Sequence, residues 1–171
     1  MTSRLVLVVA ACLLLPSRAA ADPLLTKAQI AKAANEIDAC LDKQLKAPGG
    51  TGHAQKCIGL VKGECDDHIS AGGEAAHATC SDNETAAWDV LLNKVWKELP
   101  EDLGPARFEK LKAIQKQWLA YRDAKCAFLN DPAHISAWGL MLEADCRMDE
   151  TARRTIELRD ILADPNLAAA E

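Results

Sequence analysis

Aromatic residues are scarce in this chain, at 4% of 171 positions, and no stretch alternates apolar and polar residues with a period of two. Half-buried strands are rich in aromatic and β-branched residues and show that alternation. The sequence therefore gives no sign of such strands. Its apolar residues recur instead at three- and four-residue steps, which predicts helices nearly throughout.

Positive charge is also in short supply. The chain has 20 Lys and Arg against 25 Asp and Glu, a net charge of −5. An acidic surface repels the phosphate backbone, so no nucleic-acid partner is expected. The same charge balance favours solubility, and it is compatible with contact with a basic protein.

The signatures of common enzyme classes are missing. The sequence contains no G-x-S-x-G turn, no Walker-type glycine loop and no H-E-x-x-H motif. The carboxylates are numerous, but no spacing singles out two of them as a glycosidase pair. We therefore expect a protein that is not an enzyme and uses no cofactor.

Long apolar runs are confined to the start of the chain. A short basic segment, 1–4, precedes the apolar run 5–15 and the small residues Ala19 and Ala21. This order is typical of a secretory signal peptide, here 1–21. Lipidation at Cys12, within VAAC, stays open as an alternative. No later stretch is long enough to span a bilayer, so we expect a periplasmic or secreted protein without membrane contact after cleavage.

Removal of the signal peptide leaves 150 residues with a net charge of −7. This length suits one domain with a single core. We expect an N-terminal helix and linker over 22–56, a disulfide-bonded helical domain over 57–163 that shares its core with that helix, and a tail over 164–171.

Capping motifs locate several helix starts. Thr26 and Gln29 form a capping box, as do Ser81 and Glu84. The first box precedes an apolar stripe that consists of Ile30, Ala34, Ile37, Leu41 and Leu45. A short helix is expected over 53–61 and a loop over 62–79. The second box predicts that a helix begins just after Cys80.

Two further helices follow the breaks PEDLGP at 100–105 and NDPAH at 130–134. One runs from about 106 to 129, and the other begins near Ser136 and ends before Pro165. The apolar stripe expected to pack in the core consists of Phe108, Leu111, Ile114, Trp118 and Tyr121. The fold class is therefore all-α, a small bundle of four to five helices.

Six cysteines remain after the signal peptide is removed, and an even number in an exported chain indicates three disulfides. Six cysteines allow many connectivities, among which the sequence does not choose. Short sequential loops cost the least entropy to close. We expect the pairs Cys40–Cys57, Cys65–Cys80 and Cys126–Cys146.

The segment CDDHISAGGEAAHATC raises an alternative. Cys65, His68, His77 and Cys80 have the residue types of a tetrahedral zinc site, although the spacing is not one of the usual signatures. An oxidising compartment favours a disulfide between the two cysteines instead. In that case the segment becomes an acidic, polar loop that is available for contacts.

The segment QKQWLAYRDAKC, 115–126, raises the question of catalysis. On a helix, Trp118, Tyr121, Arg122 and Cys126 share one face. A nucleophilic thiol needs a nearby base, and no His lies in this helix. We therefore expect the aromatic side chains to pack in the core, Arg122 to reach a carboxylate or a helix end, and Cys126 to form a disulfide.

Three segments together carry a family resemblance: CSDNETAAWDVLLNKVWKEL, QKQWLAYRDAKC and CRMDETARRTIEL. They resemble the LprI-like lysozyme-inhibitor domain over about 57–160. Besides Cys80, Cys126 and Cys146, the motif residues are Trp88, Asp89, Leu92, Asn93, Gln115, Trp118, Tyr121, Arg122, Asp123, Thr151, Arg154 and Leu158. One departure is Trp96, where the family more often has Tyr.

The resemblance implies a small, exported, helical and disulfide-bonded bacterial envelope protein that binds another protein. Inhibition of a basic lysozyme-type protein is the leading function. The motif residues are expected to be mainly structural, and the resemblance assigns no inhibitory residue. Two alternatives remain, namely a metal-binding module at Cys65, His68, His77 and Cys80, and an envelope stress or scaffold protein without inhibitory activity.

Overall fold

The computed structural model describes residues 24–46, 50–69, 72–130, 136–164 and 166. Within these ranges it confirms the all-α fold class, with no strand and with three disulfides. The elements are α1 (Lys27–Leu45), the 3-10 helix η1 (Gly50–Cys57), α2 (Leu60–His68), α3 (Gly73–Phe128) and α4 (Ala137–Ala163). The proposed signal peptide and Cys12 lie outside the described residues, as does nearly all of the proposed tail.

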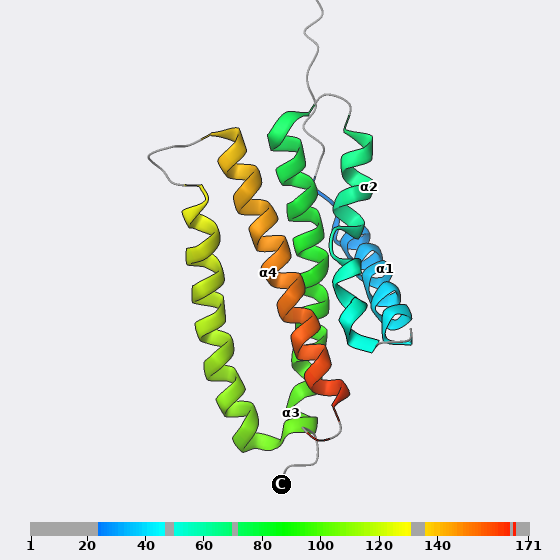
Figure 1. The fold of residues 1–171 in the computed structure, drawn as a ribbon, viewed down its shortest axis with the longest axis vertical. Helices are drawn as coiled ribbons and strands as arrows, with labels where there is room; N and C mark the ends of the chain where they lie inside the picture. Colours follow the sequence, from blue (N-terminus) through cyan, green and yellow to red (C-terminus); the bar gives the residue numbers. More distant parts are fainter. Residues whose placement is uncertain (1–23, 47–49, 70–71, 131–135, 165, 167–171) are drawn as a thin grey trace, which may run out of the picture.

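α3 is a long helix with a sharp kink. Gly104 leaves the helical conformation with φ 67° and ψ 164°, between Pro100 and Pro105. Glycine suits this positive φ because it has no Cβ. The chain reverses its direction at the kink (Figure 1). The predicted break at 100–105 is therefore a kink that divides α3 into an N-terminal arm, 73–103, and a C-terminal arm, 105–128.

The two arms flank α4, and α1 and α2 lie on the far side of the N-terminal arm (Figure 1). The main apolar cluster joins α1, η1, the N-terminal arm and α4. It includes Ile37, Leu41, Cys57, Trp88, Leu91, Met148 and Ile156. A second cluster, near the kink, consists of Leu92, Val95, Leu99, Leu103, Leu111 and Leu158. The first helix and the later helices thus share one continuous helical assembly.

The helix ends at both extremes of the bundle match their sequence signals. The capping box of Thr26 and Gln29 is formed at the start of α1. Ser136 caps α4 by accepting a hydrogen bond from the backbone N–H of Gly139 at 3.0 Å. α4 ends at Ala163, before Pro165, as predicted. These ends are local features, which is why the sequence alone could place them.

The predictions for 53–81 were partly wrong. The short helix expected over 53–61 is the 3-10 helix η1, and most of the expected loop 62–79 is helical, in α2 and the start of α3. α3 begins at Gly73, so Ser81 and Glu84 lie inside this helix and do not cap its N-terminus. The alanine-rich sequence GEAAHAT favours helix strongly enough to extend α3 upstream of the apparent cap.

The stripe predicted for the fourth helix was also partly wrong. Leu111 is buried and Phe108 packs against the second cluster, but Ile114 and Tyr121 are 51% and 56% exposed. The C-terminal arm packs along α4 at the edge of the molecule opposite α1 and α2 (Figure 1). Besides α4, the C-terminal arm contacts only the N-terminal arm near the kink among the described elements, so part of its apolar stripe stays in solvent.

Each disulfide joins neighbouring elements. The three bonds are Cys40–Cys57, Cys65–Cys80 and Cys126–Cys146. They connect α1 to η1, α2 to the N-terminal arm of α3, and the C-terminal arm to α4. The C-terminal arm is therefore covalently tied to α4, the helix along which it packs.

Candidate functional site

The four residues considered as zinc ligands do not form a metal site. Cys65 and Cys80 are bonded to each other, so neither offers a thiolate. His68 contacts the backbone oxygen of Glu64 through Nδ1 at 2.8 Å, and His77 contacts Asp66 Oδ1 at the same distance. Across the described residues, no group of three or more His, Cys, Asp or Glu could hold an ion. The structure gives the metal-binding alternative no support.

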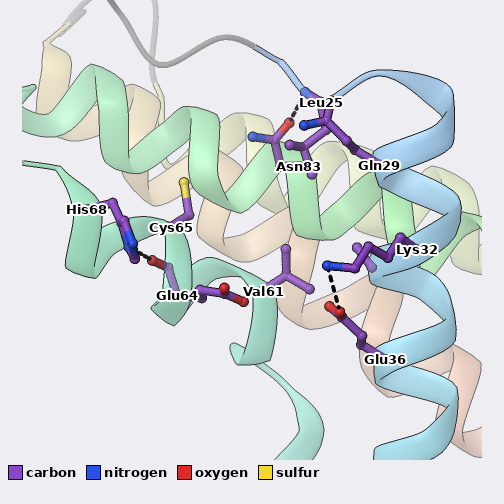
Figure 2. Close-up of a pocket in the computed structure, with 10 residues that line it drawn as sticks. Leu25, Gln29, Lys32, Glu36, Val61, Glu64, Cys65, His68 and Asn83 are labelled. Carbon is purple, nitrogen blue, oxygen red and sulfur yellow. Dashed lines mark hydrogen bonds and ion pairs between the residues drawn. The ribbon is translucent and has the colours of Figure 1, made fainter.

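A cleft of about 380 Å³ lies between α1 and α2 (Figure 2). Several of its polar side chains already have partners. Lys32 pairs with Glu36 at 3.3 Å, and the Asn83 side-chain oxygen accepts a hydrogen bond from the backbone N–H of Leu25 at 2.8 Å. These internal pairs occupy polar groups that would otherwise be free to bind a ligand in the cleft.

Glu84, which lies inside α3, is a buried carboxylate that contacts the start of α2. Glu84 is fully buried and accepts hydrogen bonds from the backbone N–H groups of Gly59, Val61 and Lys62 at 2.7–2.9 Å. It also accepts one from Trp88 Nε1 at 2.9 Å. Free N–H groups and a positive partial charge at a helix start favour a carboxylate there. Glu84 therefore caps α2, not its own helix, and its role is structural.

Five family-motif residues line a groove between the two arms of α3. The groove has a volume of about 550 Å³. Its lining residues are Asp89, Leu92, Asn93, Trp96, Lys112, Gln115, Lys116, Leu119 and Arg122. The structure thus brings together motif residues from two segments that are far apart in the sequence.

Beside this groove, motif side chains tie the C-terminal arm to α4. Trp118 lies between two guanidinium groups, with Arg122 at 5.1 Å and Arg154 at 5.9 Å from its ring centroid. Arg122 donates to Thr151 Oγ1 at 3.2 Å, and Arg154 donates from Nε to Gln115 Oε1 at 2.7 Å. These contacts favour a structural role for this part of the motif.

Two further motif residues differ in exposure and in pKa: Asn93 is exposed, and Asp89 has a raised pKa. Asn93 donates a hydrogen bond to the backbone oxygen of Asp89 within its own helix. Burial raises the pKa of Asp89, and the nearby Arg122 guanidinium offsets part of that rise. Asp123 pairs with Arg122 and Arg147. In this groove we find polar groups that can bind a ligand but no thiol or hydroxyl beside a base.

Exposed apolar side chains that the sequence patterns did not single out lie near the connection between α3 and α4. Phe128 is 81% exposed and Trp138 is 58% exposed, on either side of the connection between α3 and α4. Leu129 and Leu140 are 39% and 45% exposed. Their position next to the NDPAH break was a signal available in the sequence, because residues at helix ends often escape burial.

A second groove, of about 400 Å³, lies between the start of α3 and the start of α4. It is lined by Ala75, Ala78, Thr79, Asp82, Leu140, Glu143, Ala144 and Arg147. Glu143 binds Arg147 at 2.9 Å and accepts a hydrogen bond from Asn130 Nδ2 at 2.8 Å. These two contacts lower the pKa of Glu143, the Asn130 bond most, against the opposing effect of burial. Burial raises the pKa of Asp82, which Arg147 partly offsets.

Comparisons with known proteins place the chain in a family. A relative called "Uncharacterized protein R02472", from Rhizobium meliloti (strain 1021), is 28% identical over 96 residues, which is 48% of this chain and 69% of that protein. No solved structure matches the chain significantly. The family model described as "Lysozyme inhibitor LprI" matches residues 65–158. Because this match covers more than half of the chain, the protein belongs to the LprI lysozyme-inhibitor family.

Proposed function

We propose that this protein is an exported bacterial envelope protein that binds and inhibits a basic lysozyme. The match of the lysozyme-inhibitor family model to residues 65–158 is the observation that carries this proposal. The three disulfides support export, because disulfides persist in oxidising compartments. The similar protein from Rhizobium meliloti adds no activity, since it is uncharacterised.

Charge at one end of the bundle supports a basic partner. The end of α2, the start of α3 and the start of α4 lie together at this end (Figure 1). Asp66 at this end pairs with Lys62 and contacts His77; the other carboxylates, which we call the acidic end, are Glu64, Asp67, Glu74, Asp82 and Glu143. Of these, only Glu143 forms an ion pair among the described residues. The unpaired carboxylates leave an excess of negative charge that attracts a cationic surface.

The same end presents apolar anchors. Trp138 and Leu140 are 58% and 45% exposed, and Leu140 borders the second groove together with Asp82. Protein interfaces are organised around exposed aromatic side chains that become buried on binding, with charged groups at the rim. A Lys or Arg side chain of the partner has room in this groove and a carboxylate to bind.

Lysis of a cell-wall substrate by a basic lysozyme tests the proposal directly. We expect the purified protein, without residues 1–21, to slow lysis in a concentration-dependent manner. Trp138→Ala should raise the inhibition constant by about 30-fold, as expected for a central aromatic anchor. Glu74→Gln with Asp82→Asn should raise it by a few-fold and reduce its dependence on salt, because rim charges mainly affect association.

The matched control is Glu101→Gln with Asp102→Asn, near the kink and far from the acidic end. This pair removes the same charge and should leave inhibition unchanged. Full lysis at a large molar excess of inhibitor, across several basic lysozymes, would remove the proposed function. Inhibition that ignores Trp138→Ala but weakens in the control would move the binding surface to the other end of the bundle.

A further inference from the structure

The outer face of the C-terminal arm has no partner within the described residues. Cys126, Gln115 and Leu111 are buried against the rest of the bundle. The opposite face of the same helix is in solvent. Its residues, which we call the outer face, are Ala113, Ile114, Gln117, Ala120, Tyr121, Ala124, Ala127 and Phe128.

This outer face is uncharged over its whole length. At 100° per residue its members cover an arc of about 140°, and they extend over about 22 Å along the helix. Ile114, Tyr121 and Phe128 repeat every seven residues and are 51%, 56% and 81% exposed. Seven of the eight members are apolar or aromatic, with Gln117 the exception. Soluble domains rarely leave such a stripe bare without a use for it.

Cations border the stripe. Lys112 and Lys116 lie along one edge, Lys125 lies along the other, and Lys110 lies one turn before Ile114. Lys110 and Lys116 make no ion pair among the described residues. Lys112 contacts Glu109, and Lys125 contacts Glu150 at 2.5 Å.

The arm is strongly basic in an acidic protein. Its residues 105–128 include six Lys and Arg against two Asp and Glu, a net charge of +4 within a chain of net charge −5. A second copy docked on this face would bring two +4 arms together, and a basic lysozyme would also be repelled. An anionic surface is the complementary partner.

We propose that the C-terminal arm docks on an anionic membrane surface, with Ile114, Tyr121 and Phe128 entering the headgroup region and the lysines contacting lipid phosphates. A helix with an apolar, aromatic face bordered by lysine is the type that lies in a membrane interface. The Cys126–Cys146 bond fixes the arm on α4, so the face is presented on a rigid support. No described helix is long and apolar enough to cross a bilayer, which leaves contact from one side.

This proposal departs from the sequence-based expectation of no membrane contact after signal cleavage. That expectation followed from the absence of a spanning segment, whereas docking depends on which helix face stays exposed. It goes beyond lysozyme inhibition and does not depend on it, because the acidic end and the outer face have no residue in common.

Co-sedimentation of the protein with vesicles tests the proposal. Binding should be clear with phosphatidylglycerol–phosphatidylcholine vesicles, weak with phosphatidylcholine alone, and reduced by salt. I114S/Y121S/F128S should lower the partition coefficient by at least about tenfold. K110Q/K116Q should lower it by about fivefold for each lysine.

Each variant has a matched control elsewhere on the surface. L24S/L60S/V90S removes three exposed apolar side chains outside the arm, which are 69%, 42% and 44% exposed. K27Q/K43Q removes two exposed lysines of α1. Both controls should bind vesicles like the unmodified protein. All variants should keep the circular dichroism spectrum of the fold, since the replaced side chains are exposed, and I114S/Y121S/F128S should still inhibit lysozyme.

Four results would overturn the proposal. The first is no binding to anionic vesicles, or equal binding to neutral ones. The second is a loss in the controls as large as the loss in the outer-face variants. The third is a concentration-dependent dimer in sedimentation velocity that I114S/Y121S/F128S abolishes, which would assign the face to a second copy. Binding to soluble polyphosphate as tight as to vesicles, without any effect of I114S/Y121S/F128S, would likewise exclude a membrane role for the apolar face.

Discussion

The two arms of α3 are both helical and both contain many apolar residues, but they have very different neighbours. The N-terminal arm buries twelve residues, from Ala76 to Leu103, whereas the C-terminal arm buries only Leu111, Gln115 and Cys126. The N-terminal arm is packed by α1, α2 and α4, while the C-terminal arm lies at the edge beside α4 (Figure 1). Burial therefore follows the number of neighbours, not the apolar content of the helix.

The difference shows two ways to hold a helix in place. The N-terminal arm is held by apolar packing around Trp88, which contributes through the area removed from water. The C-terminal arm is held by the Cys126–Cys146 bond and by polar and cation–π contacts such as those of Trp118. An arm held in this second way keeps most of its surface free for contacts with other molecules.

The largest expected effect separates the two tryptophans. Trp88 is fully buried and hydrogen-bonded, so Trp88→Ala should lower the free energy of unfolding by about 4 kcal/mol. Trp118 is half-buried between two guanidinium groups, and Trp118→Ala should lower it by only about 1 kcal/mol. Urea denaturation measures both values. Equal losses would mean that the C-terminal arm is part of the core after all.

Removal of the disulfide at the edge should act locally as well as globally. The Cys126–Cys146 bond closes a loop with a sequence separation of 20, which corresponds to about 3 kcal/mol of unfolding free energy. In Cys126→Ser with Cys146→Ser, hydrogen exchange should accelerate in 105–128 far more than in 73–103. The control, Cys40→Ser with Cys57→Ser, should leave exchange in 105–128 unchanged. Uniform acceleration in both arms would contradict the comparison.

Glu84 tests the polar part of the buried arm. Glu84→Gln places an amide donor against backbone N–H groups, and the lost hydrogen bonds should cost about 2 kcal/mol. Glu98→Gln, at an exposed position on the same arm, is the control and should change stability by less than about 0.5 kcal/mol. Thermal unfolding monitored by circular dichroism measures both. A silent Glu84→Gln variant would show that α2 needs no cap.

The smallest expected effect concerns pH. Burial alone raises the pKa of Asp38, but hydrogen bonds from Lys94 and Arg159 outweigh it and hold the pKa below its usual value. The stability from this cluster is therefore present above pH 4 or so and is lost as the pH falls through the lowered pKa. We expect Asp38→Asn to cost about 1 kcal/mol at neutral pH and to flatten the acid dependence of unfolding.

The effect of Asp38→Asn on hydrogen exchange should be confined to the part of the molecule around Asp38 and should not reach the C-terminal arm. Asp38 lies on α1, and its partners lie on the N-terminal arm and on α4. Hydrogen exchange in 105–128 should therefore keep its pH profile in Asp38→Asn. A change there as large as the change in 73–103 would show that the two arms unfold together.

Local signals predicted much of the fold. The capping box at Thr26, the cap at Ser136 and the break at 100–105 each depend on a few adjacent residues, and the structure contains all three features. The second capping box predicted a helix start just after Cys80, which was wrong. Glu84 interacts instead with the start of α2, more than twenty residues upstream. Side-chain chemistry alone does not show whether a carboxylate caps its own helix or another one.

The candidate sites were harder to predict than the helices. The sequence shows that Asp89 and Arg122 belong to one family motif. It does not show that both residues line one groove, because that depends on how the kink folds the C-terminal arm back along α4. Exposure of Trp138 and Phe128 likewise depends on what lies beside the helix ends. Periodicity shows that a residue is on an apolar stripe, but it does not show whether a neighbour covers that stripe.

The sequence by itself determined the all-α class, the helix ends marked by caps and breaks, and the family motif, because these depend on local propensity and on residue identity. The tertiary structure decided which apolar stripe became the core and which stayed in solvent. Ile37 and Ile114 lie on similar stripes, yet Ile37 is fully buried and Ile114 is half exposed. The physical reason is that burial depends on the number of packed neighbours, and that number is set by distant parts of the chain.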